Sequence, residues 1–279
     1  MLELKNVNKR FKSALIAENI NVKFENCTYG LLGRNGSGKT TLLRCITNIE
    51  KINSGSIAYY DENGNAVKNY LDRIGYLPQS FDIFGDLTPP EVLEFFANLK
   101  EYKISKEEIR DLLKNLNLSD KEKAKVKTLS GGMKRRLGIA QALVGNPEIL
   151  FLDEPTSGLD PEERLNFKNV IRAVKKDRCV VLSTHIITDI ESLCDKVMVL
   201  QGGKITQFDS CRALADVAKG RVFAVENPDK LEQNYYSMGD ITIDGKSYEK
   251  VISKGGIDGA VEIEPTVEDG YICFIENLY

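Results

Sequence analysis

The chain has 279 residues, of which 42% are apolar and 28% are charged, and its formal net charge is −3. A chain of this length and composition can bury a core and usually makes one large domain or two smaller ones. No stretch approaches the roughly 18 consecutive apolar residues of a membrane span, and no apolar run follows the basic residues of Met1–Arg10. We therefore expect neither a membrane span nor a secretory signal.

The cysteines show no C-x-x-C spacing, and some fall inside predicted core strands or helices. Such a pattern favours reduced cytosolic thiols over a zinc site or a disulfide framework. The six are Cys27, Cys45, Cys179, Cys194, Cys211 and Cys273.

Strands are predicted at Leu2–Val7, Asn19–Phe24 and Thr28–Leu32, and a helix is predicted from Lys39. The segment Gly33–Thr40 between the last strand and this helix reads GRNGSGKT and fits G-x-x-x-x-G-K-[ST]. Strand, loop and helix in this order are the context that a phosphate-binding P-loop requires. The alternative is a glycine-rich turn that binds nothing.

The chemistry of this loop follows from its residue types. Glycines let backbone N–H groups close around phosphate oxygens, and the helix start adds the positive end of its dipole. Lys39 should reach the β- and γ-phosphates, and Thr40 should ligate Mg²⁺. The predicted nucleotide contacts are Gly33, Asn35, Gly36, Ser37, Gly38, Lys39, Thr40 and Thr41.

The middle of the chain is predicted to be mainly helical. A hairpin-like stretch near Ile57–Tyr60 and a strand-like Ile74–Pro78 precede a helical stretch from Pro90 to Asn117, in which apolar residues recur at helical spacing. Another helix should follow Ser130. Its basic run Lys134–Arg136 reads as a solvated helix face, with DNA binding as the weaker alternative.

An acidic pair follows the next predicted strand. Four apolar residues, Ile149–Leu152, read as a buried parallel strand, and Asp153 and Glu154 emerge at its carboxyl end, where open α/β sheets bind ligands. Asp153 is placed to hold Mg²⁺ through water, and Glu154 is placed to act as the general base on the attacking water. The alternative is two solvated acids at a strand end.

The only histidine of the chain, His185, follows a buried-type strand at Cys179–Ser183, which predicts that it lies at the same rim of the sheet. A helix should start at Pro161. Strands near Lys196–Leu200 and Lys204–Phe208 and a short helix near Arg212–Val217 complete residues 1–219, which we expect to form one ATPase domain.

The character of the chain changes at about Gly220. Residues 220–279 contain 5 basic and 12 acidic residues, and apolar residues alternate with polar ones between turn-like Asp-Gly and Gly-Gly pairs. We therefore predict a small β-rich accessory domain, for which a regulatory or dimer-contact role is a hypothesis. The residues taken as strand positions are Tyr235, Tyr236, Ile241, Ile243, Val251, Ile252, Val261, Ile263, Tyr271, Ile272, Phe274 and Ile275.

The segment Leu129–Met133, LSGGM, lies between the P-loop and the acidic strand end. With these three landmarks in this order, about residues 1–215 resemble the nucleotide-binding subunit of ATP-binding cassette (ABC) proteins. The resemblance implies an α/β P-loop NTPase of ABC type with a mixed β core and an inserted helical subdomain, here at about residues 86–145. ATP and Mg²⁺ are the implied cofactors.

The resemblance also implies roles for single residues. Gln79 is similar to the family's Q-loop glutamine, which contacts Mg²⁺ and water, and Asp160 looks like the D-loop aspartate that reaches across a dimer. His185 matches the switch histidine at the γ-phosphate. Phe11 stands where the family usually has a tyrosine that stacks on adenine, although an aromatic residue there is as often part of the core. Met133 replaces the common glutamine of the signature loop.

In the family, the signature loop contacts ATP held by the opposite subunit. Ser130, Gly131 and Gly132 should therefore cap the γ-phosphate of a second copy with a hydroxyl and helix-start amides. ATP would join two subunits head to tail, and hydrolysis would let them part.

A single cassette without a membrane span resembles the ATPase half of a transporter at the cytoplasmic face of the cell membrane. Its partners would be a separate integral permease and a second ATPase subunit. The run Leu129–Leu137 and the trailing small domain are similar to those of ATPases that serve export-type permeases. The alternative is a soluble ABC ATPase that acts on ribosomes or nucleic acid, and a non-hydrolysing binding module is disfavoured because Glu154 is present.

Overall fold

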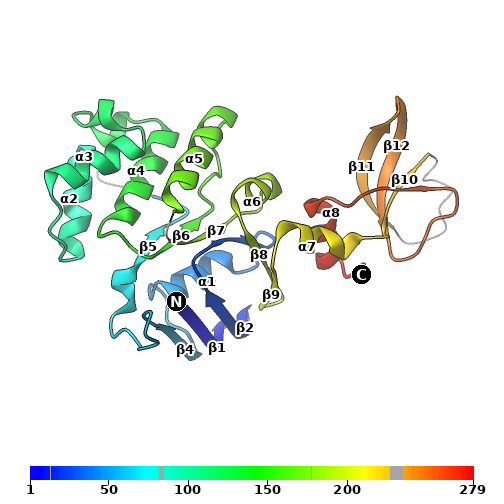
Figure 1. Ribbon diagram of the computed structural model, residues 1–279, viewed down its shortest axis with the longest axis horizontal. Helices are drawn as coiled ribbons and strands as arrows, with labels where there is room; N and C mark the ends of the chain where they lie inside the picture. Colours follow the sequence, from blue (N-terminus) through cyan, green and yellow to red (C-terminus); the bar gives the residue numbers. More distant parts are fainter. Residues whose placement is uncertain (13, 82–84, 177, 227–234) are drawn as a thin grey trace. The chain divides into compact units, whose positions relative to one another are not determined.

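The structure is a computed structural model that describes residues 1–279 except 13, 82–84, 177 and 227–234. It divides into two compact units, Met1–Gln207 and Phe208–Tyr279, which are described separately below (Figure 1). The sequence placed the boundary twelve residues later, between 219 and 220.

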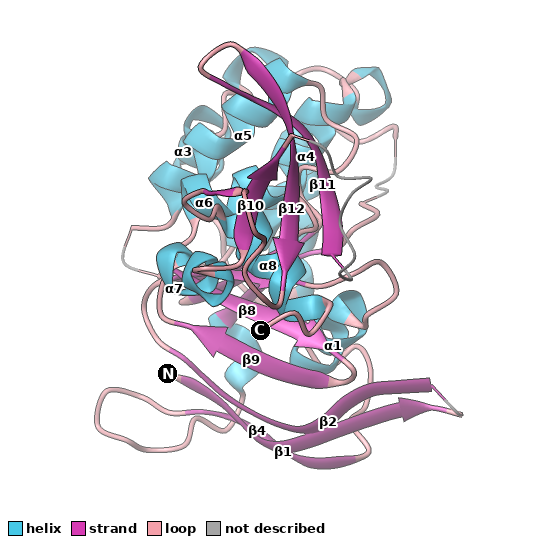
Figure 2. Cartoon of the chain, turned by 90° about the vertical axis from the view of Figure 1, so that its right-hand side faces the viewer, coloured by secondary structure: helices cyan, strands magenta, loops and turns pink. Residues whose placement is uncertain are grey.

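An antiparallel sheet forms one layer of the first unit (Figure 2). Its strand order is β2-β1-β4, with β1 at Leu2–Phe11, β2 at Ala14–Phe24 and β4 at Ser54–Tyr59. The β1 and β2 strands run further than predicted, and their pairing continues across several register shifts. Such shifts let a ladder continue past residues that break the alternating pattern.

A six-stranded sheet forms the second layer and has the order β5-β6-β7-β3-β8-β9. The five strands from β5 to β8 pair in parallel. The strands are β3 at Thr28–Leu32, β5 at Ile74–Leu77, β6 at Ile149–Asp153, β7 at Cys179–Ser183, β8 at Lys196–Gln201 and β9 at Lys204–Phe208. All residues of β3, β6 and β7 are buried, as expected for parallel strands covered on both faces.

Helices cover this sheet and build the helical subdomain. The predicted helical stretch from Pro90 to Asn117 contains two helices, because Ser105 and Glu108 form a capping box that starts a second helix. The helices are α1 at Lys39–Ile46, α2 at Pro89–Leu99, α3 at Lys106–Asn115, α4 at Gly131–Leu143, α5 at Pro161–Val174 and α6 at Ile187–Leu193. No helix in the described ranges is both long and apolar enough to cross a membrane.

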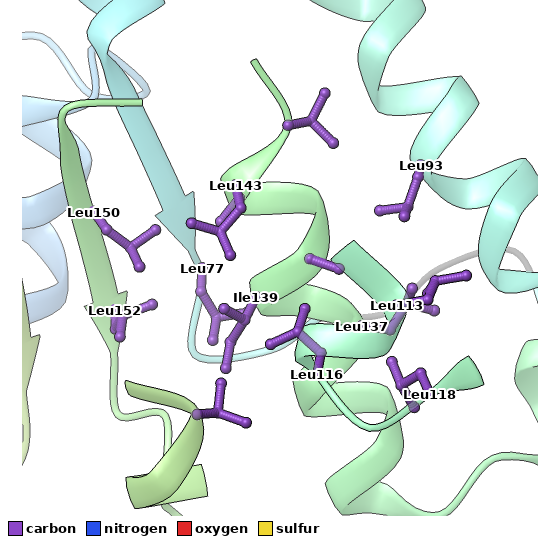
Figure 3. Packing of buried hydrophobic residues seen from close by; sticks show 14 of the residues in the cluster. Leu77, Leu93, Leu113, Leu116, Leu118, Leu137, Ile139, Leu143, Leu150 and Leu152 are labelled. Carbon is purple, nitrogen blue, oxygen red and sulfur yellow. The ribbon is translucent and has the colours of Figure 1, made fainter. Parts of the chain in front are cut away.

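Helix α4 is the centre of the larger hydrophobic core. In Figure 3, Leu77 of β5 and Leu150 of β6 lie on one side of α4, and Leu93 of α2 and Leu113 of α3 lie on the other. Most residues of α4 are buried. The core thus joins the helical subdomain to the sheet through one helix, which begins at the signature loop.

Two glycines let α4 lie directly on β5. A Cβ on Gly75 would collide with the carbonyl oxygen of Ala142, and a Cβ on Gly138 would lie 2.6 Å from Leu77 Cδ1 and 2.9 Å from Phe81 Cδ1. The backbone of β5 therefore touches the backbone of α4 at Gly75, and the side chains of Leu77 and Phe81 pack directly against the backbone of α4 at Gly138.

Replacement of Gly75 by alanine should lower the free energy of unfolding of the first unit by about 1–3 kcal/mol, because α4 must shift away from β5. Urea unfolding followed by circular dichroism measures this loss. The matched control is Gly256→Ala, where an added Cβ meets open space. An equally small effect of both substitutions would contradict the close packing of α4 on β5.

The second unit carries a four-stranded sheet of order β11-β12-β10-β13 and two helices, of which the last one packs against the sheet. Its elements are α7 at Cys211–Ala215, β10 at Val222–Val225, β11 at Tyr235–Ile243, β12 at Lys246–Ser253, β13 at Val261–Glu262 and α8 at Val267–Ile275. The two helices touch so closely that a Cβ on Gly270 of α8 would collide with the carbonyl of Leu214 in α7. This contact explains why α7, which the sequence assigned to the ATPase domain, belongs to the second unit.

The prediction of strand structure was wrong for Tyr271, Ile272, Phe274 and Ile275, which lie in α8. A capping box explains the helix: the Asp269 N–H donates to Thr266 Oγ1 (3.3 Å), and an Asp269 carboxylate oxygen accepts from the Thr266 N–H at 2.7 Å. The spacing of these four apolar residues, i, i+1, i+3 and i+4, also fits one face of a helix.

Candidate nucleotide site

The polar residues predicted for the rim of the sheet follow four strands that are neighbours in the order β5-β6-β7-β3. Gln79 follows β5, Glu154 follows β6 and His185 follows β7, while the P-loop from Gly33 follows β3. Because these strands are parallel, their carboxyl ends meet at one edge of the sheet.

A cavity of about 390 Å³ opens at this edge. Ten predicted site residues line it: Asn35, Gly36, Ser37, Gly38, Lys39, Thr40, Thr41, Gln79, Glu154 and His185. Ile16 of β2 and Ser157 line it as well, and the sequence did not single them out. Ser157 belongs to the segment that resembles the D-loop, but Ile16 is an ordinary apolar strand residue without a distinguishing signal.

The loop has the geometry of a phosphate cradle. Gly36 (φ 78°) and Gly38 (φ 103°) are left-handed, and a Cβ on Gly38 would lie 2.8 Å from Ile16 Cγ2. The first-turn amides of α1, from Lys39 onward, have no acceptor within the helix. Ser37 Oγ is buried and has no hydrogen-bond partner among the residues that the structure describes. Unsatisfied donors at a helix start fit an anionic ligand.

The side chain of Lys39 lies within the loop and is only 6% exposed. Its Nζ donates to the carbonyl of Gly33 at 2.8 Å and to that of Arg34 at 3.4 Å. The main-chain carbonyls of the loop thus hold the ammonium group of Lys39 beside the cavity.

Glu154 connects this cation to the histidine. It leaves β6 in the left-handed region (φ 45°), and its side chain is largely buried. One carboxylate oxygen lies 3.5 Å from Lys39 Nζ, and the other lies 2.9 Å from His185 Nδ1. Left-handed backbone is costly for a residue with a Cβ and is concentrated at functional sites.

Asp153 is fully buried and lies outside the cavity lining. Ser183 Oγ donates to Asp153 Oδ1 at 2.6 Å, and the Tyr76 hydroxyl lies 3.5 Å from Oδ2. Burial, together with the charge of Asp153, raises the pKa of Tyr76 to about 12. Tyr76 is therefore a neutral hydrogen-bond donor beside this carboxylate.

Several predicted residues lie away from the cavity lining of their own chain. Ser130 caps α4 and accepts from the Met133 N–H at 3.1 Å, and Asp160 caps α5 and accepts from the Glu163 N–H at 2.8 Å. Both are exposed. The predicted residues outside the lining are Phe11, Gly33, Ser130, Gly131, Gly132, Asp153 and Asp160.

Phe11 ends β1 with 44% of its surface exposed, and its ring centroid lies 4.2 Å from Lys9 Nζ. The alternative that Phe11 belongs to the core is therefore wrong. An exposed ring keeps the face that a base could stack on.

The interpretation of Lys134–Arg136 as a solvated helix face was wrong for both arginines. Arg136 is buried and its Nη2 lies 3.5 Å from Glu163 Oε1, while the Arg135 guanidinium donates to backbone carbonyls. Their long side chains run back into the protein from the start of α4 because this helix is buried on most of its surface.

The sequence of the chain is similar to those of known proteins. Residues 17–157 match the model of the ABC transporter family. The chain belongs to this family as an ATP-binding subunit. It is 35% identical over 209 residues to Nod factor export ATP-binding protein I of Burkholderia orbicola, covering 73% of this chain and 68% of that protein. It is 32% identical over 244 residues to methionine import ATP-binding protein MetN of Clostridium tetani, covering 84% and 77%.

The ABC cassette fold is confirmed by solved structures. The dimeric post-hydrolysis structure of the ATP-binding cassette MJ0796 with ADP and Pi matches with a TM-score of 0.64 and 28% identity, covering 75% of this chain and 98% of that one. The chain is thus an ABC ATPase that binds ATP. Its named relatives serve transporters, and they do not favour an ATPase that acts on ribosomes or nucleic acid.

Proposed function

We propose that this ABC ATPase hydrolyses ATP in the cavity at the rim of the six-stranded sheet, with Glu154 as the general base. The support is the convergence on this cavity of the buried Lys39 ammonium, the Glu154 carboxylate and His185. In this proposal Lys39 and the loop amides hold the phosphates, Glu154 takes the proton of the attacking water, and His185 contacts the γ-phosphate.

A Mg²⁺ ion fits the oxygen donors of this site, because Thr40 and Gln79 line the cavity. Asp153, which directly precedes the lining residue Glu154 in the sequence, supplies a buried carboxylate. The proposed ligands are Thr40, Gln79 and, through water, Asp153. When bound, the ion would neutralise phosphate charge. Ser183 and Tyr76 would fix the Asp153 carboxylate by their hydroxyl groups.

We propose that a second ATPase subunit completes the site. Ser130 and Asp160 are exposed helix caps outside their own chain's cavity lining, which supports a role toward the nucleotide of a partner copy. The serine hydroxyl and the amides at the start of α4 would then cap the γ-phosphate. The solved dimer of MJ0796 with ADP and Pi supports such an assembly.

We further propose that the dimer drives a separate integral permease from the cytoplasmic face of the membrane, in export of a drug, peptide or other substrate. The signature run Leu129–Leu137 and the export relative support this direction, whereas the import relative is the competing case. Affinity purification in mild detergent should recover a multispan membrane protein. Recovery of ribosomes or DNA instead would contradict the transport proposal.

A further inference from the structure

The side chain of Arg135, six residues after the start of the signature loop, uses all of its hydrogen-bond donors on main-chain carbonyls. Its Nε donates to Pro155 O (3.0 Å), its Nη1 to Pro78 O (3.2 Å) and Gln79 O (2.6 Å), and its Nη2 to Asp153 O (2.9 Å) and Glu154 O (2.5 Å). A guanidinium has five N–H donors, and here five carbonyls accept them. One side chain thus holds the segments that follow β5 and β6.

These segments carry two residues of the proposed reaction. Gln79 lines the nucleotide cavity, and the Glu154 side chain reaches both Lys39 and His185. Three successive carbonyls, from Asp153 to Pro155, converge on the guanidinium while Glu154 is left-handed. The hydrogen bonds therefore offset part of the strain of the turn that aims the Glu154 carboxylate into the cavity.

The helix that carries Arg135 has little freedom relative to β5. Gly75 and Gly138 let backbone and side chains of the two elements touch, and Gln141 Nε2 donates to the carbonyl of Tyr76 at 2.9 Å. Figure 3 shows Leu77 of β5 packed against Ile139 and Leu143 of the same helix. A side chain on a helix that is packed closely against the sheet can fix the positions of the loops that it binds.

We propose that Arg135 is a positioning residue for ATP hydrolysis, because its guanidinium fixes the main chain of Gln79 and Glu154 in the geometry that the attacking water requires. This inference rests on the proposed roles of Gln79 and Glu154. In this proposal Arg135 does not contact the nucleotide, so its substitution should change the rate of turnover and not the affinity for ATP.

Lysine cannot replace arginine in this role. A lysine ammonium has three donors at one point, whereas the guanidinium presents five in a planar fork. Arg135→Lys should lower kcat about 10- to 100-fold, since displacements of about 1 Å at reacting groups cost up to about 100-fold. The KM and the affinity for ATP should stay within about threefold of the unsubstituted full-length chain.

The matched control is Arg110→Lys on the exposed surface of α3, which makes the same chemical change away from the site, and its kcat should not change. Arg135→Ala, measured beside them, should regain part of its kcat when about 10–50 mM guanidinium chloride fills the vacated site, whereas equal sodium chloride should have no effect. Thermal unfolding of each variant with ADP verifies that it is folded. If Arg135→Ala does not fold, the kcat and KM of Arg135→Lys decide the question alone.

Three results would overturn the inference: an unchanged kcat in Arg135→Lys, a raised KM with unchanged kcat, or equal losses of kcat and ATP affinity. Glu154→Gln is measured in the same assay. If Glu154→Gln is inactive while Arg135→Lys turns over normally, the positioning role fails and the proposed function stands. Normal turnover of Glu154→Gln would instead reject the proposed site.

Discussion

Glu154→Gln should lower the rate of ATP hydrolysis by about 10²–10⁴-fold while ATP still binds. An amide cannot accept the proton of the attacking water, and general-base catalysis typically contributes a factor of this size. ATP affinity should not fall, because the carboxylate lies 3.5 Å from Lys39 Nζ and competes there with a phosphate for the same ammonium group. Steady-state phosphate release and equilibrium binding of ATP measure the two effects.

The matched control for this substitution is Glu107→Gln on the exposed first turn of α3. This variant makes the same chemical change outside the cavity, so its hydrolysis rate should equal that of the unsubstituted chain. Normal phosphate release by Glu154→Gln would reject Glu154 as the base. Loss of ATP binding in Glu154→Gln would show instead that the carboxylate supports the loop.

Lys39→Ala should weaken ATP binding about 10- to 100-fold. A hydrogen bond to a charged group contributes about 1.5–3 kcal/mol, and no other cation lines the cavity in the part of the chain that the structure describes. The substitution also leaves the Glu154 carboxylate without its nearby positive charge. Titration calorimetry with ATP measures the change in Kd.

Lys39→Arg should not restore binding, because the Lys39 side chain is nearly buried between loop carbonyls and a planar guanidinium has a different shape. The exposed Lys106→Ala is the control for the loss of a single positive charge. If Lys39→Ala binds ATP as tightly as this control, phosphates bind elsewhere.

Much of the site could be predicted from the sequence because its residues directly follow buried strands. Gln79, Glu154 and His185 each come one or two residues after the end of a short strand, and parallel strands bring such positions to one edge. The P-loop could be predicted because glycine spacing and the Lys-Thr pair specify a local structure. Local sequence signals were therefore sufficient where neighbouring parallel strands bring the site residues together.

Other features depend on contacts that leave no local signal. Arg135 binds main-chain carbonyls, which every residue carries, so its partners could not be read from residue types. Ile16 lines the cavity only because β2 passes the P-loop helix. The helix at Val267–Ile275 did have a signal, the Thr266 and Asp269 capping pair, which the alternation of apolar residues obscured.

The claim on which the account depends is that ATP joins two copies of this chain through their signature loops. Light scattering of the full-length Glu154→Gln variant with saturating ATP and Mg²⁺ tests it most directly. We expect a mass of twice 31.2 kDa with ATP and 31.2 kDa after ATP is removed. A mass of 31.2 kDa in both conditions would contradict the shared site if ATP also fails to pair two copies of the chain when the membrane partner is present.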